Sequence, residues 1–436
     1  MSEKKTESRR NFLKGSTLAV AGATLAGSVN FTRMVHAQGS GMLKAVLIGC
    51  GGRGNGAIED HLTADENVKV VAVADAFEDR AKGTAKRLTD GKFKSRIDIP
   101  AERVFVGLEA YKQAIACGCD VVVTASPPGF RPFIYKAAIE AGKHVFMEKP
   151  CCVDAPGFKM LMEANKLADE KGLKVVVGLQ RRHSNNYKET INRIHDGEMG
   201  KITLLRAYWN GGGIWNRPRQ PDMTEMQYQV HNWYHFRWLS GDNIGEQHVH
   251  NLDVVNWVMD DHPVEANGMG GCTARYLGGN KGTGQIFDHH FVEFTYKDGT
   301  KMYSQCRHMA DTWSNVSEAA HGTKGESNCS GHIKGEKEWH FSGDNPNSMV
   351  QEHKDLIAAI RNGGKCNDGW YGATSSFTAV LGCEANYSGQ VIKWDDLVAK
   401  GKSQFPAKLA WDAPAPFEKD ANGDYPIATP GKYKSW

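Results

Sequence analysis

The chain contains two groups of residues whose types and spacing suit proton transfer. The first is Glu148-Lys149-Pro150, which follows a β-favouring run at residues 144–147. Proline fixes φ and lacks an amide hydrogen, so Pro150 ends the strand and leaves Glu148 and Lys149 where the strand becomes a loop. A lysine there can be an ordinary surface residue. Ligands, however, bind beyond the carboxyl ends of strands in open α/β sheets, which makes Lys149 a candidate site residue.

The second group is Glu246, His250 and Asp253, which lie four and three residues apart. On one helix they would share a face, and a carboxylate beside an imidazole is the arrangement of a general base. With His248 as a third ligand the same residues could hold a metal, and they could also be a solvated helix start. We favour the general base and predict no metal site.

A glycine-rich turn joins the first expected strand, residues 44–48, to a helix-like run through His61. Its residues are Gly49, Cys50, Gly51, Gly52, Arg53 and Gly54. A GxGxxG pattern is weak evidence alone and much stronger between a strand and a helix. The glycines let the backbone approach a pyrophosphate at the helix N-terminus, so we expect a dinucleotide there. A glycine-rich turn without a ligand is the alternative.

Asp75 ends the second expected strand, residues 68–74. An acidic residue about 20 residues beyond the glycines can accept hydrogen bonds from the adenosine ribose hydroxyls, and it would repel a 2′-phosphate. The position therefore predicts NAD rather than NADP, although Arg80 close behind weakens this preference. A plain strand-end aspartate is the alternative.

Strands and helices continue to alternate up to residue 177. Further strands are expected at 121–124, 144–147 and 174–177, and helices at 108–117, 130–141 and 156–171. Continuous apolar strands separated by such helices predict a doubly wound parallel sheet that is buried on both faces. The predicted fold class is therefore α/β, with a Rossmann domain at residues 38–178.

The second half, residues 179–436, follows another pattern. Helices are expected at 185–195, 348–361 and 376–388, and strands at 201–208, 289–296 and 301–306, the last two joined by a hairpin turn. Residues 209–238 are rich in Gly, Trp, Asn, Gln and Arg, which predicts a long loop that either contacts sugars or packs its aromatic side chains. We predict an α+β domain with an open, mostly antiparallel sheet.

Composition and charge exclude some partners. The 436 residues carry 53 basic and 50 acidic side chains, a net charge of +3, which does not suggest a nucleic-acid binder. The 10 cysteines include no CxxC pair, so neither a zinc ribbon nor a thioredoxin-like site is expected.

Residues 1–37 resemble a twin-arginine export signal. Paired arginines precede Phe-Leu-Lys, a mildly apolar run spans 15–29, and residues 35–37 form a small-x-small cleavage pattern. The run is too short and too rich in small residues for a membrane span. We expect the twin-arginine machinery to export the folded chain to the periplasm; a disordered tail is the alternative.

The motifs resemble those of the Gfo/Idh/MocA oxidoreductases over nearly the whole mature chain. They are the glycine-rich turn, Ala-Ser-Pro-Pro at 125–128, Glu-Lys-Pro at 148–150, Gly-Leu-Gln-Arg-Arg at 178–182, the helix with His250, and Gly-Thr-Lys-Gly at 322–325. The resemblance implies a Rossmann domain followed by an open-sheet domain. It also implies a homo-oligomer, a dimer or tetramer, assembled through the exposed face of that sheet.

The resemblance further implies roles for single residues. Lys149 would polarise or deprotonate a substrate hydroxyl, with His250 as acid/base partner and Glu246 where the family usually has aspartate. Asp253 would bind a substrate hydroxyl, and Arg182, also assigned to substrate binding, would border the nicotinamide together with Gln180. The implied cofactor-binding residues are the glycine-rich turn, Asp75, Ser126, Pro127, Glu148 and Gln180.

The implied activity is hydride transfer between NAD, or less readily NADP, and a secondary alcohol of a carbohydrate such as a sugar, polyol or glycoside. Because free NAD is not recycled in the periplasm, we expect a tightly held cofactor. One alternative is a hydrolase or lyase that uses NAD catalytically, by transient oxidation and elimination. The other is a nucleotide-binding protein without catalysis.

Overall fold

The computed structural model describes residues 41–273 and 283–436. The predicted export signal, residues 1–37, lies outside the described residues. Within the described part, none of the helices has both the length and the apolar character needed to cross a membrane.

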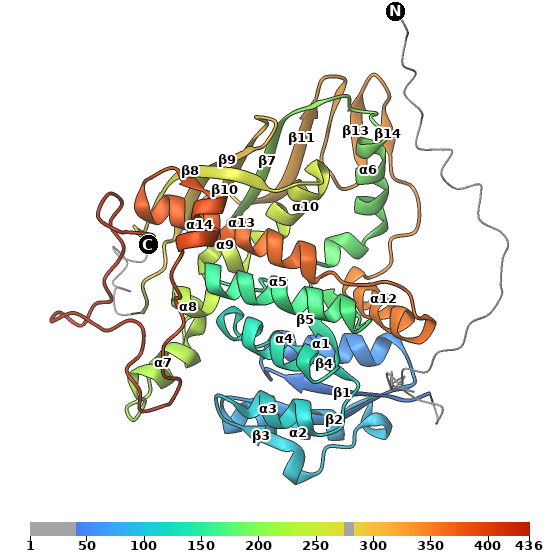
Figure 1. Cartoon of the computed structure of the whole chain (residues 1–436), viewed down its shortest axis with the longest axis vertical. Helices are drawn as coiled ribbons and strands as arrows, with labels where there is room; N and C mark the ends of the chain where they lie inside the picture. Colours follow the sequence, from blue (N-terminus) through green and yellow to red (C-terminus); the bar gives the residue numbers. More distant parts are fainter. Residues whose placement is uncertain (1–40, 274–282) are drawn as a thin grey trace, which may run out of the picture. The chain divides into compact units, whose positions relative to one another are not determined.

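The first part of the chain builds a six-stranded parallel sheet in the order β3-β2-β1-β4-β5-β6, low in Figure 1. The strands are β1 (Leu43–Ile48), β2 (Val68–Asp75), β3 (Val104–Val106), β4 (Val121–Thr124), β5 (His144–Met147) and β6 (Val175–Val177). Valine dominates them because both faces are covered by helices. This is the strand order of the Rossmann fold, so the prediction of a doubly wound sheet is confirmed.

Five helices of this sheet follow directly in the sequence. They are α1 (Gly52–Ala64), α2 (Glu78–Asp90), α3 (Ala110–Ala116), α4 (Arg131–Glu140) and α5 (Ala155–Glu170). A sixth, α12 (Ser348–Asn362), returns from the other half and packs beside α1 (Figure 1), with Leu356 and Ile357 buried in the same core. Val175 of β6 also bridges to Asn367. The second half of the sequence therefore completes the first layer.

The second part builds a nine-stranded sheet in the order β14-β13-β12-β11-β7-β10-β9-β8-β15. The strands are β7 (Ile202–Gly211), β8 (Pro263–Gly271), β9 (His289–Tyr296), β10 (Lys301–His308), β11 (Asn315–Gly322), β12 (Gly325–Ser327), β13 (His332–Gly335), β14 (Trp339–His340) and β15 (Ile392–Lys393). Only β7 and β10 pair in parallel among these described strands. The predicted mostly antiparallel sheet is confirmed.

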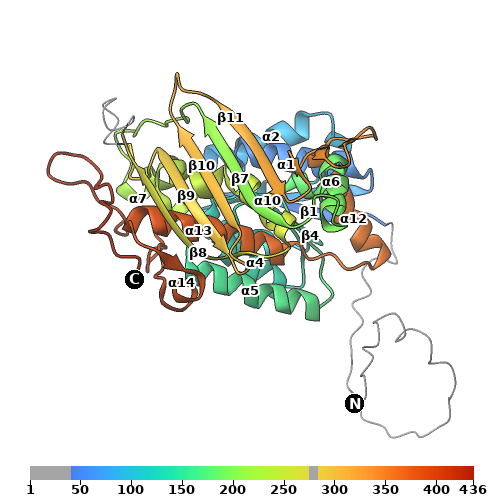
Figure 2. The same ribbon diagram turned by 90° about the horizontal axis from the view of Figure 1, so that it is seen from above.

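One face of this sheet is buried and the other is half-exposed, as the strict alternation of β9 and β10 shows. The helices α10 (Val249–Met259) and α13 (Gly369–Ser388) pack on the buried face, and Figure 2 shows them behind the strands. The remaining helices of this half are α6 (Asn185–His195), α7 (Glu225–His231), α8 (Arg237–Ser240), α9 (Asp242–Glu246) and α14 (Trp394–Lys400).

The predicted long loop at 209–238 is wrong for much of its length. Strand β7 runs on to Gly211 because β10 and β11 pair with it on both sides. Thr224 and Gln227 form a capping box that starts α7, and a 3-10 turn and α8 follow at once. Most aromatic and apolar side chains of residues 209–238 are buried. Their packing overrides the loop-like composition of this segment. The remaining connection spans only residues 212–224.

Candidate active site

The carboxyl end of β5 brings Lys149 against the end of α9. Its Nζ donates to the main-chain carbonyl of Glu246 and lies 3.2 Å from Glu246 Oε1. The two side chains are only 12% and 11% exposed. After Pro150 the chain is held by Arg131 Nη1, which donates to the Pro150 carbonyl at 2.7 Å. The ammonium group is thus fixed in a mostly desolvated place.

Glu246 and His250 do not share one helix, so that part of the prediction is wrong. Glu246 ends α9, and His250 is the second residue of α10, with a break at Gln247 and His248. The reason is that the buried His248 ring turns into the core, where its Nε2 lies 2.7 Å from the hydroxyl of Ser304 on β10. His248 is therefore engaged with the core of the sheet domain through this nitrogen.

His250 is a buried imidazole beside this pair. Its ring stacks on the indole of Trp209 with centroids 6.0 Å apart, and its Nδ1 has no hydrogen-bond partner among the described residues. Burial, and after it the positive charge of Lys149, holds the pKa of His250 well below its usual value. Burial raises the pKa of Glu246, opposed by Lys149. The site thus combines a cation, a carboxyl group and a neutral imidazole.

Arg182 and Asp253, the two predicted substrate-binding residues, are paired with each other. Arg182 Nε and Nη2 both lie 2.9 Å from oxygens of the Asp253 carboxylate, which also accepts a hydrogen bond from Ser375 at 2.8 Å. The guanidinium lies 3.9 Å from the ring centroid of Tyr371. A direct contact of either residue with a substrate stays a prediction, since the pair already holds itself in place.

The glycine-rich turn is packed on one side and open on the other. Gly49 has φ +92°, and a Cβ there would come within 2.5 Å of the Ser126 amide nitrogen. A Cβ on Gly54 would come within 1.9 Å of the Gly49 carbonyl oxygen, whereas Gly51 and Gly52 face open space. Such a cradle at the N-terminus of α1 fits a pyrophosphate.

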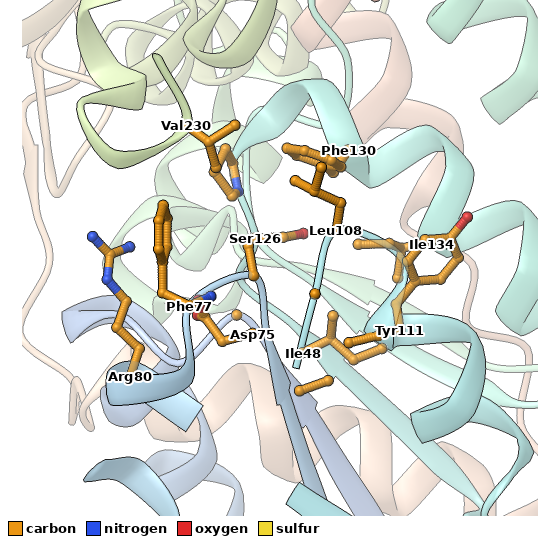
Figure 3. A pocket seen from close by; sticks show the side chains of 16 residues that line it. Ile48, Asp75, Phe77, Arg80, Leu108, Tyr111, Ser126, Phe130, Ile134 and Val230 are labelled. Atoms are coloured by element: carbon orange, nitrogen blue, oxygen red, sulfur yellow. The ribbon is translucent and has the colours of Figure 1, made fainter. Parts of the chain in front are cut away.

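Asp75 lies at a hollow between the ends of β1, β2 and β4 (Figure 3). Its carboxylate accepts hydrogen bonds from the amides of Cys50 at 2.7 Å and Phe77 at 2.9 Å, which ties it to the glycine-rich turn. Burial raises its pKa. Ser126 and Pro127 also line the hollow, and their contact with a cofactor stays a prediction.

Residues of the second half contribute to this hollow and to its surroundings. Val230 of α7 lines it, as does Phe77 (Figure 3). The Phe77 ring in turn contacts His231 and Trp411, with ring centroids 5.7 and 5.5 Å apart. No local sequence pattern indicated these contacts, because they join residues more than 150 positions apart.

Two arginines stand near the same hollow. The Arg80 guanidinium lies 4.9 Å from the Phe77 ring centroid, and that of Arg217 lies 4.1 Å from the Trp215 centroid. Burial, followed by the positive charge of Arg80, lowers the pKa of Arg217 to about 10. In the sequence, only the composition of the loop around Arg217 indicated that this residue could belong to a binding site.

Glu148 is held beneath the glycine-rich turn. Arg53 Nε donates to Glu148 Oε1 at 2.5 Å, and a Cβ on Gly178 would approach Glu148 Oε2 at 2.7 Å. The ion pair joins α1 to the end of β5. Gln180 begins the 3-10 turn that follows β6 and is half-buried. Direct contact of these three side chains with a cofactor stays a prediction.

Comparison with known proteins identifies the parallel-sheet part. Residues 43–179 match the oxidoreductase family with an NAD-binding Rossmann fold, GFO_IDH_MocA, which confirms the predicted resemblance over this range. Inositol 2-dehydrogenase of Azotobacter vinelandii is 31% identical over 219 residues, which cover 49% of this chain and 54% of the relative. The chain thus spans about half the length of the curated relatives it matches.

Solved structures share the fold across both parts. Apo scyllo-inositol dehydrogenase from Lactobacillus casei has a TM-score of 0.61 at 17% identity, covering 82% of this chain and 99% of its own. GenD2 from gentamicin A biosynthesis, in complex with NAD, has a TM-score of 0.59 at 17% identity, covering 85% and 99%. At these identities the likeness shows the fold alone.

Proposed function

We propose that the protein is an NAD-dependent oxidoreductase that transfers a hydride between its cofactor and a secondary alcohol of a sugar or polyol. The observation that carries the proposal is the position of Lys149 at the carboxyl end of β5, where Glu246 holds its ammonium group. There the positive charge of Lys149 acts on the buried imidazole of His250. This is the edge at which Rossmann sheets bind dinucleotides. The names of the relatives, inositol dehydrogenases, support alcohols of this class.

The residues of the site divide the proton work. NAD, when bound, supplies the hydride acceptor. Lys149 donates a hydrogen bond to the reacting hydroxyl and stabilises negative charge on its oxygen, while Glu246 keeps the ammonium in place. His250, neutral at pH 7, can take up the hydroxyl proton as the carbonyl forms, and it returns a proton in the reverse reaction. The buried Arg182–Asp253 pair holds one wall of the site.

The hollow at Asp75 supports a tightly held cofactor. It is bounded by strand ends of the first sheet and lined by Val230 from the second half, while His231 and Trp411 pack against Phe77, which also lines it. The Asp75 carboxylate favours a free ribose diol and hence NAD, whereas Arg80 and Arg217 supply positive charge for a 2′-phosphate. We keep NAD as the preferred cofactor.

The remaining parts of the proposal concern the setting. The twin-arginine pattern of residues 1–37 supports export to the periplasm, and fractionation of cells that produce the full chain tests it. The half-exposed face of the nine-stranded sheet offers a surface for a homo-oligomer, which sedimentation measures.

The deciding experiment uses the full chain, purified without added cofactor. The protein is denatured, the released NAD(H) and NADP(H) are quantified, and sugars and inositols are screened for a change in bound-cofactor absorbance. Stoichiometric NAD that a polyol reduces is the expected result. Bond cleavage without net redox change would indicate the NAD-dependent hydrolase or lyase. A protein that holds and binds neither dinucleotide contradicts the proposal.

A further inference from the structure

The hairpin at the far edge of the nine-stranded sheet places two imidazoles on one face. His332 of β13 is the direct antiparallel partner of His340 of β14. Side chains of directly opposed residues lie on the same face of a sheet. The two rings accordingly stack, with centroids 4.0 Å apart and planes 14° from parallel. Glu338 precedes His340 by two residues, and the period of an extended chain puts it on the same face.

The ligand atoms of the three side chains lie close together. Glu338 Oε1 lies 3.6 Å from His332 Nε2 and 3.4 Å from His340 Nε2, and the three ligand atoms all lie within 4.8 Å of one another. In a tetrahedral zinc site with bonds of about 2.0–2.1 Å, ligand atoms are about 3.3–3.4 Å apart. Two of the three separations therefore already have nearly the spacing that one bound ion imposes.

The shielding of one ring nitrogen of His332 is a second sign, although the side chain as a whole is 34% exposed. Its Nε2 is shielded from solvent and has no hydrogen-bond partner among the described residues, although it faces the Glu338 carboxylate. A buried polar atom without a partner is uncommon in a folded protein and often marks a missing ion or water. Trp339 lies between Glu338 and His340 in the sequence. The Arg193 guanidinium lies 4.5 Å from its ring centroid, and this contact anchors the hairpin to α6.

We propose that His332, Glu338 and His340 bind one divalent transition-metal ion of the zinc type. Two imidazole nitrogens and one carboxylate oxygen suit Zn²⁺ and leave a fourth position for water, whereas Mg²⁺ and Ca²⁺ prefer oxygen ligands alone. The ion would join the two outermost strands of this edge of the sheet. The proposal concerns none of the residues used for hydride transfer, so it stands independently of the proposed activity.

The test is a zinc titration of the full chain after removal of metals with EDTA. We expect the unchanged protein to bind one Zn²⁺ per chain with a Kd of about 1 μM or below. The Kd should rise by about tenfold or more in His332→Ala, Glu338→Gln and His340→Ala. His321→Ala is the matched control, because His321 lies on the same sheet 3.4 Å from the single carboxylate of Glu326. This variant should bind zinc like the unchanged protein.

The ligand type is checked by X-ray absorption of the zinc-loaded protein. Nitrogen and oxygen ligands give distances of about 2.0–2.1 Å, whereas binding to cysteine gives about 2.3 Å. Thermal midpoints measured in EDTA show whether each variant folds. If a histidine variant unfolds, Glu338→Gln still tests the site, because glutamine has nearly the same shape as glutamate. Absent micromolar binding, zinc–sulfur scattering, or equal binding by the His332→Ala/His340→Ala double variant would overturn the proposal.

Discussion

Lys149 finds two acceptors on a single residue, the main-chain and the side-chain oxygens of Glu246. Because the carbonyl belongs to the end of α9, the ammonium group is held by the backbone as well as by a carboxylate. A shorter aspartate would withdraw its carboxylate by about one bond length, 1.5 Å, yet leave the carbonyl contact intact. The choice between glutamate and aspartate at position 246 therefore affects the placement of the negative charge more than the position of Lys149.

Replacing Lys149 by methionine keeps the length of the side chain and removes its charge. We expect kcat/KM for the best polyol to fall by about 10²- to 10⁴-fold, the usual contribution of a positioned acid/base group, with the bound NAD content unchanged. Steady-state kinetics and cofactor quantification measure both.

Lys136→Met is the control for this variant. Lys136 pairs with Glu140 on the surface of α4, so its loss should leave kcat/KM unchanged. Activity of the Lys149→Met protein within about threefold of the original would remove Lys149 from the proposed mechanism.

At the scale of secondary-structure elements, His183 joins three segments. Its Nδ1 lies 2.6 Å from Asp355 of α12 and its Nε2 3.4 Å from Asp368 before α13, while its own 3-10 turn follows β6. Burial lowers its pKa, but the two carboxylates outweigh burial and the pKa lies above the usual value. His183 thus ties the start of the second half to the helix that returns to the first.

His183→Gln should therefore lower stability in a pH-dependent way. A raised pKa in the folded state stabilises fully below the unfolded value of about 6.5, and this contribution is lost as pH rises through the folded pKa. Urea unfolding at pH 6 and pH 9 should show a large deficit of the variant at pH 6 and a smaller one at pH 9. A deficit that is equal at both pH values would show that the ion pairs do not carry it.

Trp411 belongs to the irregular C-terminal segment, and its indole packs against Phe77, one of the residues that line the hollow at Asp75. We expect Trp411→Ala to speed dissociation of bound NAD by about three- to tenfold, the equivalent of one aromatic contact. Trp370→Ala is the control, since that indole bonds Asp169 at the surface. Stopped-flow displacement of the cofactor measures the rates, and an unchanged rate for Trp411→Ala would argue against a role of this contact in retaining the cofactor.

Local patterns were sufficient for the first sheet and its turns, because strands such as 121–124 and the strand end at Lys149 depend on neighbouring residues. The sequence placed His250 near Glu246 but did not indicate the helix break between them, and the acid/base role of His250 stays a prediction. The pairing of Arg182 with Asp253, the contact of Trp411 with Phe77 and the ion pairs of His183 could not be predicted, since each joins residues that only the folded chain brings together. Capping at Thr224 was readable but was masked by the loop-like composition around it.

At the scale of the whole molecule, a buried ion pair ties the tail to the core. Arg237 of α8 donates to Glu384 of α13 and, at 2.7 Å, to the hydroxyl of Tyr433, and both charged side chains are at most 5% exposed. Removing one partner would leave the other charge buried without compensation. Substitution of only one of the two charged residues is therefore expected to destabilise this core.

Glu384→Ala should lower the free energy of unfolding by roughly 3–5 kcal/mol, because Arg237 remains buried and charged. The double variant Arg237→Met/Glu384→Leu, which removes both charges, should lose less. Lys400→Met is the control, as its pair with Asp396 is exposed and worth at most about 1 kcal/mol. Urea denaturation, monitored by circular dichroism, measures the free energy of unfolding of all three variants. A double variant that is less stable than Glu384→Ala would contradict this expectation.

The return of α12 to the first sheet has a consequence for synthesis on the ribosome. Leu356 and Ile357 complete the core around β1 and α1, and Asn367 extends the edge at β6. The nucleotide-binding layer therefore remains unfinished until some 190 further residues beyond β6 have left the exit tunnel. A nascent chain halted near residue 178 should expose this apolar strip to chaperones, whereas one released after residue 367 can close it.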